Sequence, residues 1–544
     1  MPILSFRPIP DTTRWKCPLL LTSTRRTTGP WPRPGTTGYR RRGMNLSARP
    51  ADIIIIGAGA AGLELARIAS RQGLAVVLFE QGAPNGRHLF QRIPLMVGKI
   101  IGNRRFVDAQ DSVPQMAAGN RQLPVLTGRG LGGSSRVNGN VAYAGPLERY
   151  RYVFGGINLD YTNVLNVLHG DANAPRPHSW ADELSEKFLS AAEKMGAPRV
   201  DDPDNVGEFA GASVLHVNTR YGLRHNHLEA FRANAAPQNI RIIRAPVKRI
   251  ILDGKRATGV AYEGGEIFAS EVVLSAGAIS SPLLLMRSGI GSADMVQAAG
   301  LPVLHDLPHV GQHLKDHANL RLQFSCPGHN TLNQKTRGVR ALWEGVKYAL
   351  GRKDSILRGP GASAGANFAD GDIFSKAYRI QLVHFTQDRS QVSDKGIVFE
   401  RAQKASLGIY ALWPKSEGSV RITAEGAQID PGFLRDPADV ETSLRGMAQA
   451  RVLMAQMGFE PDPVDAPDED ILRNGVYSGY HLIGSNRMSP DSGSGVVGPD
   501  FAVHGLQGLS VCDASVMPDH LSSHSYLPTI AMARMFAQQR GWAA

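Results

Sequence analysis

Residues 52–62 read Asp-Ile-Ile-Ile-Ile-Gly-Ala-Gly-Ala-Ala-Gly, and this stretch decides the fold. The isoleucine run is continuous rather than alternating, which is typical of a strand buried on both faces. The glycines lead into a helix-prone segment at 63–72 and then into a second strand-like run at 74–79. A strand, a Gly-x-Gly-x-x-Gly turn, a helix and a second strand together form the βαβ unit that binds dinucleotides. The sequence therefore predicts an α/β chain with a Rossmann-like nucleotide-binding domain.

Each glycine of the turn has its own physical role. Gly57 permits the tight turn, Gly59 lets the backbone approach a pyrophosphate, and Gly62 lets the helix pack closely on the strand. A side chain at any of the three would interfere with one of these functions.

The start of the helix and the end of the second strand complete the predicted site. At Ala60 and Ala61 the helix N-terminus presents backbone N–H groups and a favourable dipole to phosphates. Glu80 follows the second strand, 18 residues after Gly62, where a carboxylate accepts hydrogen bonds from a ribose. A purely structural glycine turn does not explain Glu80. The pattern predicts nucleotide binding and leaves FAD and NAD as alternatives.

Length and composition exclude several classes of protein. The chain has 544 residues, 42% hydrophobic and 20% charged, which predicts two or three globular domains. No apolar run approaches the roughly 20 residues of a membrane span. Three cysteines are too few for a disulfide framework or a cysteine zinc site, so we expect a soluble, cytoplasmic protein without a metal.

The positive charge is concentrated at the start of the chain. Residues 1–43 hold nine Lys or Arg and one acid, so only about +4 of the formal +12 belongs to the rest. No basic groove is implied, and we expect no nucleic-acid partner. The segment 1–46 is expected to be a basic, disordered extension. It is an upstream addition to a natural start at Met44, a disordered tail or an organelle transit peptide, and we favour the first.

Three further segments resemble the signatures of one enzyme family. They are Gly-Arg-Gly-Leu-Gly-Gly-Ser-Ser-Arg-Val-Asn at 128–138 (the first signature), the segment 277–291 that opens with Gly-Ala-Ile-Ser-Ser-Pro (the second signature), and the C-terminal block 480–533. Together with the glycine turn they make the chain similar to the glucose–methanol–choline (GMC) oxidoreductases, which are FAD enzymes. One departure is Arg151, which stands where the family pattern usually has an acidic or amide residue.

The resemblance implies a discontinuous domain organisation. A Rossmann-like FAD-binding domain would comprise 47–150, 205–320 and 480–544. An α+β substrate domain with an antiparallel sheet would comprise 151–204 and 321–479. Strand-like runs at 378–385, 408–413 and 419–423, and an amphipathic helix capped by Ser179 and Asp182, fit this division.

The resemblance also implies the FAD contacts. The contacts would come from the glycine turn, Glu80, the first signature and three later positions: Gly57, Gly59, Ala60, Ala61, Gly62, Glu80, Arg129, Gly132, Gly133, Ser134, Asn138, Val247, Asp513 and Ala514. Asp513 would contact the ribityl or pyrophosphate region, and Val247 the adenine side. Some members attach FAD covalently through a His in the first signature. Val137 stands at that position, so we expect non-covalent FAD.

Two histidines match the family's catalytic positions. Oxidation of an alcohol needs a base that removes the hydroxyl proton, and histidine suits this role because its ordinary pKa is about 6.5. The resemblance makes His481 this base, and His524, 43 residues later, the group that hydrogen-bonds the substrate oxygen. The alternative is that either ring only fills a hydrogen-bonding position in the core.

Two other segments allow alternative interpretations. His305, His309, His313 and His317 recur every four residues, which on a helix would suggest metal ligands, but Pro308 and Gly311 argue against a helix. In the family Asp316 and His317 are mainly structural. Residues 335–352 have basic and apolar residues at helical spacing, so they form either a membrane-surface helix or a solvated helix over the substrate pocket. We favour the solvated helix.

Three functions compete. The favoured one is FAD-dependent oxidation of the CH–OH group of an alcohol, with oxygen or another electron acceptor as second substrate. The alternatives are a flavin-containing lyase of the same fold and a non-catalytic FAD protein. Apolar side chains between 88 and 124, from Phe90 to Phe106, suggest an organic alcohol rather than a charged sugar.

Overall fold

The isoleucine run folds as a buried strand at the start of a βαβ unit. The computed structural model describes residues 51–82, 88–157, 159, 161, 176–177, 182–204, 209–387 and 396–542. Strand β1 (Ala51–Ile56) leads through the glycines into helix α1 (Ala60–Arg71) and strand β2 (Val76–Phe79). β1 and β2 are parallel, as the continuous apolar run predicts. The predicted extension at 1–46 and the cap residue Ser179 lie outside the described residues.

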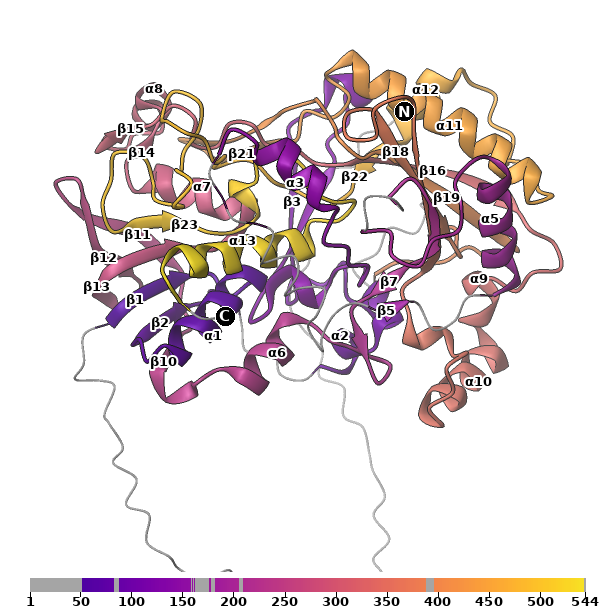
Figure 1. Cartoon of the computed structure of the whole chain (residues 1–544), viewed down its shortest axis with the longest axis horizontal. Coiled ribbons are helices and arrows are strands. Elements are labelled where there is room, and N and C mark those ends of the chain that lie inside the picture. The colour runs from indigo at the N-terminus through magenta and orange to yellow at the C-terminus, as the bar shows by residue number, and fades with distance from the viewer. Residues whose placement is uncertain are drawn as a thin grey trace, which may run out of the picture. The chain divides into compact units, whose positions relative to one another are not determined.

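A seven-stranded sheet gathers strands from three distant parts of the chain. β10, β2, β1 and β13 are parallel in that order, and β23 also pairs parallel with β13. The first residues of β13 pair antiparallel with β12, which in turn pairs antiparallel with β11. Helix α13 packs on α1, so the end of the chain lies beside its first described helix (Figure 1). The further elements of this half are β10 (Ile240–Ile243), β11 (Val247–Asp253), β12 (Arg256–Tyr262), β13 (Gly265–Leu274), β23 (Leu509–Val511), α7 (Gly277–Arg287) and α13 (Tyr526–Gln539).

A six-stranded sheet forms the second half and has its own apolar core. Its strand order is β22, β16, β19, β18, β17, β6, and all neighbours are antiparallel. Helices α5 and α11 pack on it, and Asp182 caps α5 in a capping box with Ser185. The elements are β6 (Ala212–Val214), β16 (Ala318–Ser325), β17 (Ala362–Ala369), β18 (Ala377–Val383), β19 (Lys404–Ala411), β22 (Tyr477–Ser478), α5 (Glu183–Lys194), α11 (Pro437–Gln456) and α12 (Asp468–Gly475).

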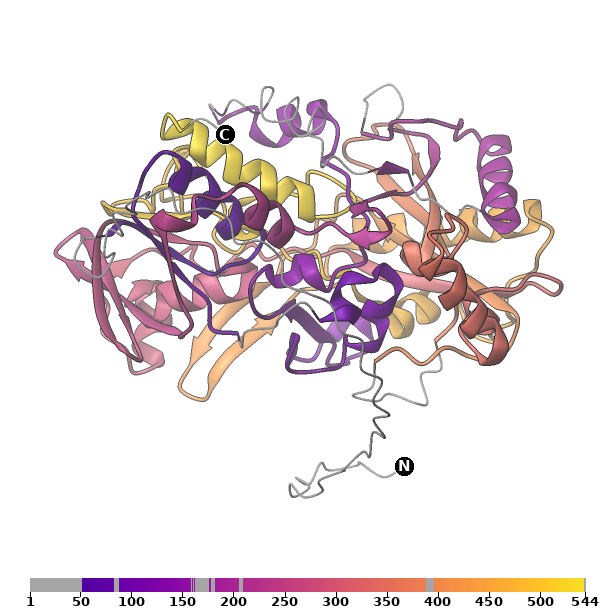
Figure 2. The same ribbon diagram turned by 90° about the horizontal axis from the view of Figure 1, so that it is seen from below.

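The boundaries between the two halves differ from the predicted ones at two elements. The hairpin β20 (Ser419–Thr423) and β21 (Gly426–Asp430) packs on α7 and on α8 (Ala293–Ala298), in the nucleotide-binding half (Figure 2). The reason is that Val420, Ile422 and Ile429 bury their side chains in that core. Conversely, β6 pairs with β17, so it belongs to the six-stranded sheet. Leu46–Ala544 as a whole form one compact unit.

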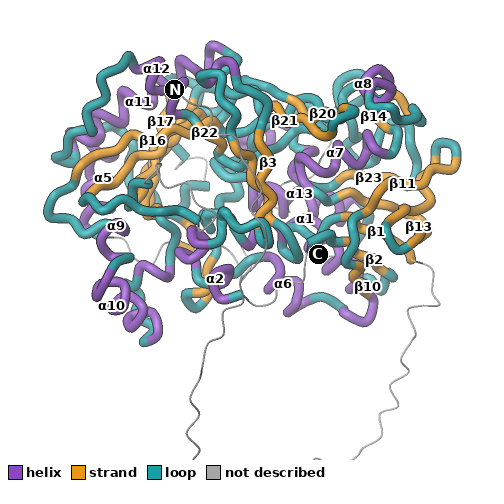
Figure 3. The backbone as a smooth tube through the Cα atoms, turned by 180° about the vertical axis from the view of Figure 1, so that it is seen from behind, coloured by secondary structure: helices purple, strands orange, loops and turns teal. Residues whose placement is uncertain are grey.

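Shorter elements lie outside the two sheets. The β3–β4 hairpin lies between the two halves in the view from behind (Figure 3). These elements are α2 (Leu89–Arg92), β3 (Val107–Asp111), β4 (Pro124–Gly128), α3 (Leu147–Phe154), β5 (Arg176–Pro177), β7 (His216–Val217), β8 (Thr219–Arg220), β9 (Leu223–Arg224), α6 (His227–Asn234), β14 (Ile290–Gly291), β15 (His305–Asp306), α9 (Leu332–Lys335) and α10 (Gly338–Ala349). Among the described residues, no helix is long and apolar enough to cross a membrane.

The histidine-rich segment is not a helix. β15 contains His305, and residues 307–317 form turns and extended backbone. The rings of His309 and His313 stack at 5.1 Å, but His305 bonds the carbonyl of His504, and His317 faces His481. The four rings therefore do not line one helical face.

Candidate active site

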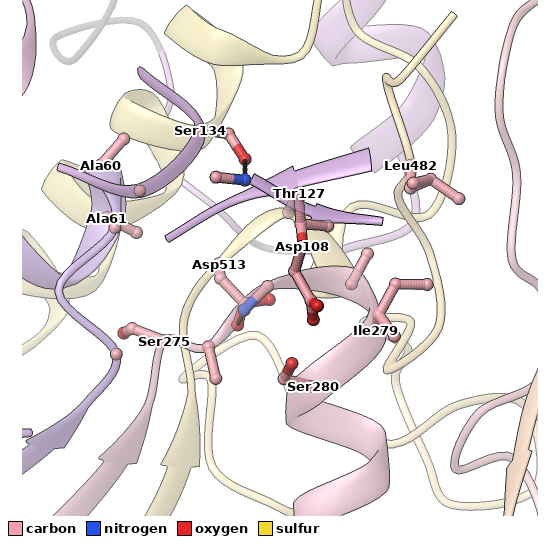
Figure 4. A pocket seen from close by; sticks show the side chains of 18 of the residues that line it. Ala60, Ala61, Asp108, Thr127, Ser134, Ser275, Ile279, Ser280, Leu482 and Asp513 are labelled. Atoms are coloured by element: carbon pink, nitrogen blue, oxygen red, sulfur yellow. Dashed lines mark hydrogen bonds between the residues drawn. The ribbon is translucent and has the colours of Figure 1, made fainter. Parts of the chain in front are cut away.

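A cavity of about 440 Å³ opens at the carboxyl ends of the parallel strands, where α/β folds bind nucleotides. In Figure 4, Ala60 and Ala61 lie on one side of it, Leu482 lies on the other, and Asp513 lies between them. The cavity brings together most of the predicted site residues, namely Gly57, Gly59, Ala60, Ala61, Glu80, Arg129, Gly133, Ser134, Asn138, Val247, His481, Asp513, Ala514 and His524. Gly62 and Gly132 are not part of its lining.

The glycine turn leaves one wall of the cavity without side chains. A Cβ on Gly62 would lie 1.9 Å from the carbonyl oxygen of Gly57, and one on Gly57 would lie 2.4 Å from that of Ser275. These two glycines therefore serve internal packing. A Cβ on Gly59 would come no closer than 3.9 Å to the carbonyl oxygen of Ser275. Because Gly59 also lines the cavity, it leaves room there for a ligand against the backbone.

The carboxylate of Glu80 ties three loops together. It is buried, and it accepts hydrogen bonds from the N–H groups of Ala58 at 3.2 Å, Gly82 at 2.7 Å and Gly130 at 3.1 Å. Glu80 thus holds the glycine turn against the first-signature loop. Its expected contact with a ribose is additional to these three bonds.

The first-signature loop lies directly on the glycine turn. The N–H of Gly132 donates to the carbonyl of Ala58 at 2.7 Å, and a Cβ on Gly133 would lie 3.0 Å from the Cα of Gly59. The hydroxyl of Ser134 accepts from the N–H of Gly128 at 3.0 Å. The loop therefore also presents glycine backbone to the cavity.

Asp513 joins the second signature to the C-terminal block. At the end of β23 its carboxylate accepts from the N–H of Gly277 at 2.8 Å, the hydroxyl of Ser281 at 2.6 Å and the N–H of Ser515 at 2.8 Å. Ser281 was not singled out from the sequence, although it lies within the second signature. The glycine walls, the open N-terminus of α1 and these anchored loops fit a flavin dinucleotide.

His481 and His524 lie side by side at the cavity. Their ring centroids are 4.9 Å apart, the rings are inclined at 67°, and both rings are half-buried. Burial, with a smaller contribution from His317, holds the pKa of His481 well below its ordinary value. Burial, followed by His481, does the same for the pKa of His524. Both rings are therefore neutral near pH 7.

A third histidine fixes the tautomer of His481. His317 is fully buried, and burial lowers its pKa to about 4, so it is neutral. Its Nε2 lies 2.9 Å from the carbonyl oxygen of Leu412 and must carry the hydrogen. Its Nδ1 is therefore a lone-pair acceptor, 2.9 Å from Nδ1 of His481. Nδ1 of His481 must then donate, which leaves the lone pair on its Nε2.

Asp316 binds the backbone at both of these histidines. One carboxylate oxygen accepts the backbone N–H groups of both His317 and His481 at 2.8 Å, and the other accepts the hydroxyl of Ser478 at 2.5 Å. Burial raises the pKa of Asp316 to about 6. The sequence predicted a mainly structural role for Asp316 and His317. Because their contacts with His481 join segments more than 160 residues apart, no local sequence pattern indicates their place beside the site.

The apolar residues of the segment 88–124 do not line this cavity, so the preference for an organic alcohol stays a prediction. Phe90, Ile100 and Phe106 pack in a small apolar cluster of their own, and Leu95 packs in another. None of the apolar residues from 90 to 106 lines the cavity, to which this segment contributes Asp108 and Gln110. Residues 335–352 are also absent from its lining, so the favoured interpretation of α10 as a cover for the pocket is not supported.

Comparisons with known proteins agree with this architecture. A family model described as GMC oxidoreductase matches residues 51–319, and the model of that family's C-terminal part matches 414–533. The oxygen-dependent choline dehydrogenase of Pectobacterium atrosepticum is 30% identical over 539 residues, covering 90% of this chain and 94% of that protein.

Solved structures show the same fold. Pyridoxine 4-oxidase from Mesorbium loti matches with a TM-score of 0.77 and 24% identity, covering 90% of this chain and 99% of that one. Formate oxidase from Aspergillus oryzae matches with a TM-score of 0.77 and 20% identity over 90% and 98% of the two chains.

Proposed function

Because this chain belongs to the GMC oxidoreductase family and is thus an FAD-dependent oxidoreductase, we propose that it oxidises the CH–OH group of an alcohol, with His481 as general base. The observation that carries the proposal is one continuous cavity. It joins a side-chain-free dinucleotide turn to two adjacent neutral histidines.

FAD, when bound, supplies the acceptor for the hydride that leaves the alcohol carbon. The residues proposed to hold it are Gly57, Gly59, Ala60, Ala61, Gly62, Glu80, Arg129, Gly132, Gly133, Ser134, Asn138, Val247, Asp513 and Ala514. Gly62 and Gly132 act from behind the lining, through the packing of the turn and the loop.

His481 is proposed to take the hydroxyl proton on Nε2. The bond from its Nδ1 to His317 leaves the Nε2 lone pair available, and the low pKa keeps that lone pair unprotonated near pH 7. A positioned base of this kind contributes roughly 10²–10⁴ in rate. The proton moves from the alcohol oxygen to Nε2 as the hydride leaves the same carbon.

His524 is proposed to bind the substrate oxygen. Its Nδ1 lies 3.0 Å from the hydroxyl of Ser523, and its ring packs edge-on against His481. A hydrogen bond to the developing alkoxide is stronger than one to the neutral alcohol, so this contact favours the transition state.

Anaerobic flavin reduction tests the assignment. The purified protein is mixed without oxygen with aliphatic, benzylic and amino alcohols while the flavin absorbance is followed, and admission of air then separates an oxidase from a dehydrogenase. Both His481→Ala and His524→Ala should keep FAD. With an alcohol that reduces the flavin of the parent protein, reduction should be about 10²–10⁴-fold slower in His481→Ala and at least about 10-fold slower in His524→Ala. His329→Ala changes a half-buried histidine that is not part of the lining, and it is the matched control.

Near-normal reduction in His481→Ala would disprove the role of that base. A flavin that no alcohol in the panel reduces would count against alcohol oxidation and favour a lyase or a non-catalytic FAD protein.

FAD is proposed to be held without a covalent bond. Val137 stands at the position of the attaching histidine, and its side chain packs partly buried against the cluster around Phe106. Acid denaturation should therefore release all of the yellow colour into the supernatant. Flavin that stays with the precipitated protein would contradict this proposal.

A further inference from the structure

Helix α10 turns its apolar residues outward. Val339, Leu342, Trp343, Val346 and Leu350 recur at spacings of three and four, so they form one stripe along the helix. Their side chains are 44–81% exposed, and they make up five of the fifteen large exposed hydrophobics in the described part of the chain. In Figure 1 the helix lies at the edge of the six-stranded half, remote from the nucleotide-binding sheet.

Polar contacts hold the opposite face of α10. Glu344 is the buried residue of the helix, and its carboxylate accepts the N–H of Ile356 at 3.0 Å. The hydroxyl of Tyr348 donates to the carbonyl of Gly222 at 3.0 Å, and that of Ser355 donates to the carbonyl of Glu344 at 3.1 Å. These bonds fix the orientation of the helix. The apolar stripe therefore faces solvent because the opposite face is held by specific contacts, and not because the helix is poorly packed.

Basic side chains surround the stripe. Residues 335–354 contain six Lys or Arg and two acids. Glu344 is buried and pairs with Lys347 at 2.9 Å, and Asp354 pairs with Lys347 at 3.3 Å and with Arg352 at 3.2 Å. Arg340 and Lys353 are exposed and form no ion pair among the described residues. The segment around the apolar stripe therefore carries a net charge of +4.

We propose that α10 docks the enzyme on an anionic lipid surface, with the apolar stripe in the interface and the basic residues against lipid headgroups. A helix with this division of residues lies in the plane of a membrane and does not cross it. Charge complementarity favours a lipid surface over a second copy of the chain as the partner that covers the stripe. A second copy of the chain would bring one basic helix against another, whereas an anionic bilayer neutralises the charge and covers the stripe. The proposal is independent of the proposed reaction.

Vesicle flotation with the full-length protein tests the proposal. Vesicles of phosphatidylcholine alone and of phosphatidylcholine with 30 mol% phosphatidylserine serve as probes. We expect binding to the anionic vesicles only, weakened at least about tenfold in Leu342→Glu/Trp343→Glu. The matched control is Phe268→Glu/Leu304→Glu, which changes two exposed apolar residues outside α10.

The charge contribution is tested separately. Each basic residue near an anionic surface contributes about fivefold to binding, so Arg340→Glu/Lys353→Glu should weaken it at least tenfold. Arg104→Glu/Arg241→Glu makes the same charge change at two other exposed positions. Brominated lipid should quench tryptophan fluorescence in the parent but much less in Trp343→Phe.

Two results would overturn the proposal. Vesicle binding that is unchanged in the α10 variants would place it elsewhere, for example in the basic segment at 1–43. A concentration-dependent dimer that Leu342→Glu/Trp343→Glu converts to monomer would show that a second copy covers the stripe. Flavin absorbance of each variant confirms that it is folded.

Discussion

At the scale of single residues, His317 determines which nitrogen of His481 is basic. Without an acceptor beside Nδ1, the hydrogen of His481 is free to occupy either nitrogen, and the tautomer with hydrogen on Nε2 has no lone pair for the substrate. The side chain at 317 is therefore a positioning residue for the proposed base.

Two substitutions at this position separate its hydrogen bond from its packing. His317→Leu removes the acceptor and should slow flavin reduction by alcohol about 10–100-fold, with FAD content unchanged. His317→Gln keeps an acceptor oxygen and should restore much of the rate. An unchanged rate in His317→Leu would show that the contact is only structural.

At the scale of elements, the turn between β1 and α1 contains glycines with different tasks. A methyl group at 62 would meet the carbonyl of Gly57 at 1.9 Å, so Gly62→Ala should prevent the turn and helix from packing and give insoluble protein. A methyl group at 59 meets open cavity, so Gly59→Ala should fold yet lose FAD on gel filtration. Gly345→Ala, where nothing lies within 4 Å, is the control. Soluble, yellow Gly62→Ala would refute this division of roles.

How far the sequence predicts the structure also differs between elements. The βαβ unit is predicted because its signals are local: an apolar run, glycines at fixed spacing and a helix follow one another directly. The sequence predicts β20 as a strand at 419–423, but it does not predict which apolar core the β20–β21 hairpin packs against. The apolar residues of the hairpin would suit either of the two cores. The role of His317 is not predicted for a similar reason. Its role depends on a contact with His481, 164 positions away.

At the scale of the whole molecule, neutral histidines with lowered pKa values link stability to pH. Burial lowers the pKa of His317 and His384 to about 4, and it holds those of His481, His520 and His524 well below the ordinary value. In the unfolded chain each would titrate near pH 6.5. Above that pH neither state binds these protons, so they make no difference to the free energy of unfolding.

Between pH 6.5 and about 4 these histidines bind protons in the unfolded chain but not in the folded chain. The free energy of unfolding therefore falls as the pH falls. One such histidine accounts for at most about 3 kcal/mol. Asp316 and Asp439 act in the opposite direction because burial raises the pKa of both, that of Asp316 to about 6, but they are two groups against five. We therefore expect Tm to be level from pH 8 to 7 and to drop steeply from 6.5 to 4.5. His520→Phe, which removes a buried ring stacked on His317 at 3.9 Å, should make that drop shallower. A Tm that stays level down to pH 5, or an equally steep drop in His520→Phe, would show that these histidines are not the groups that limit stability in acid.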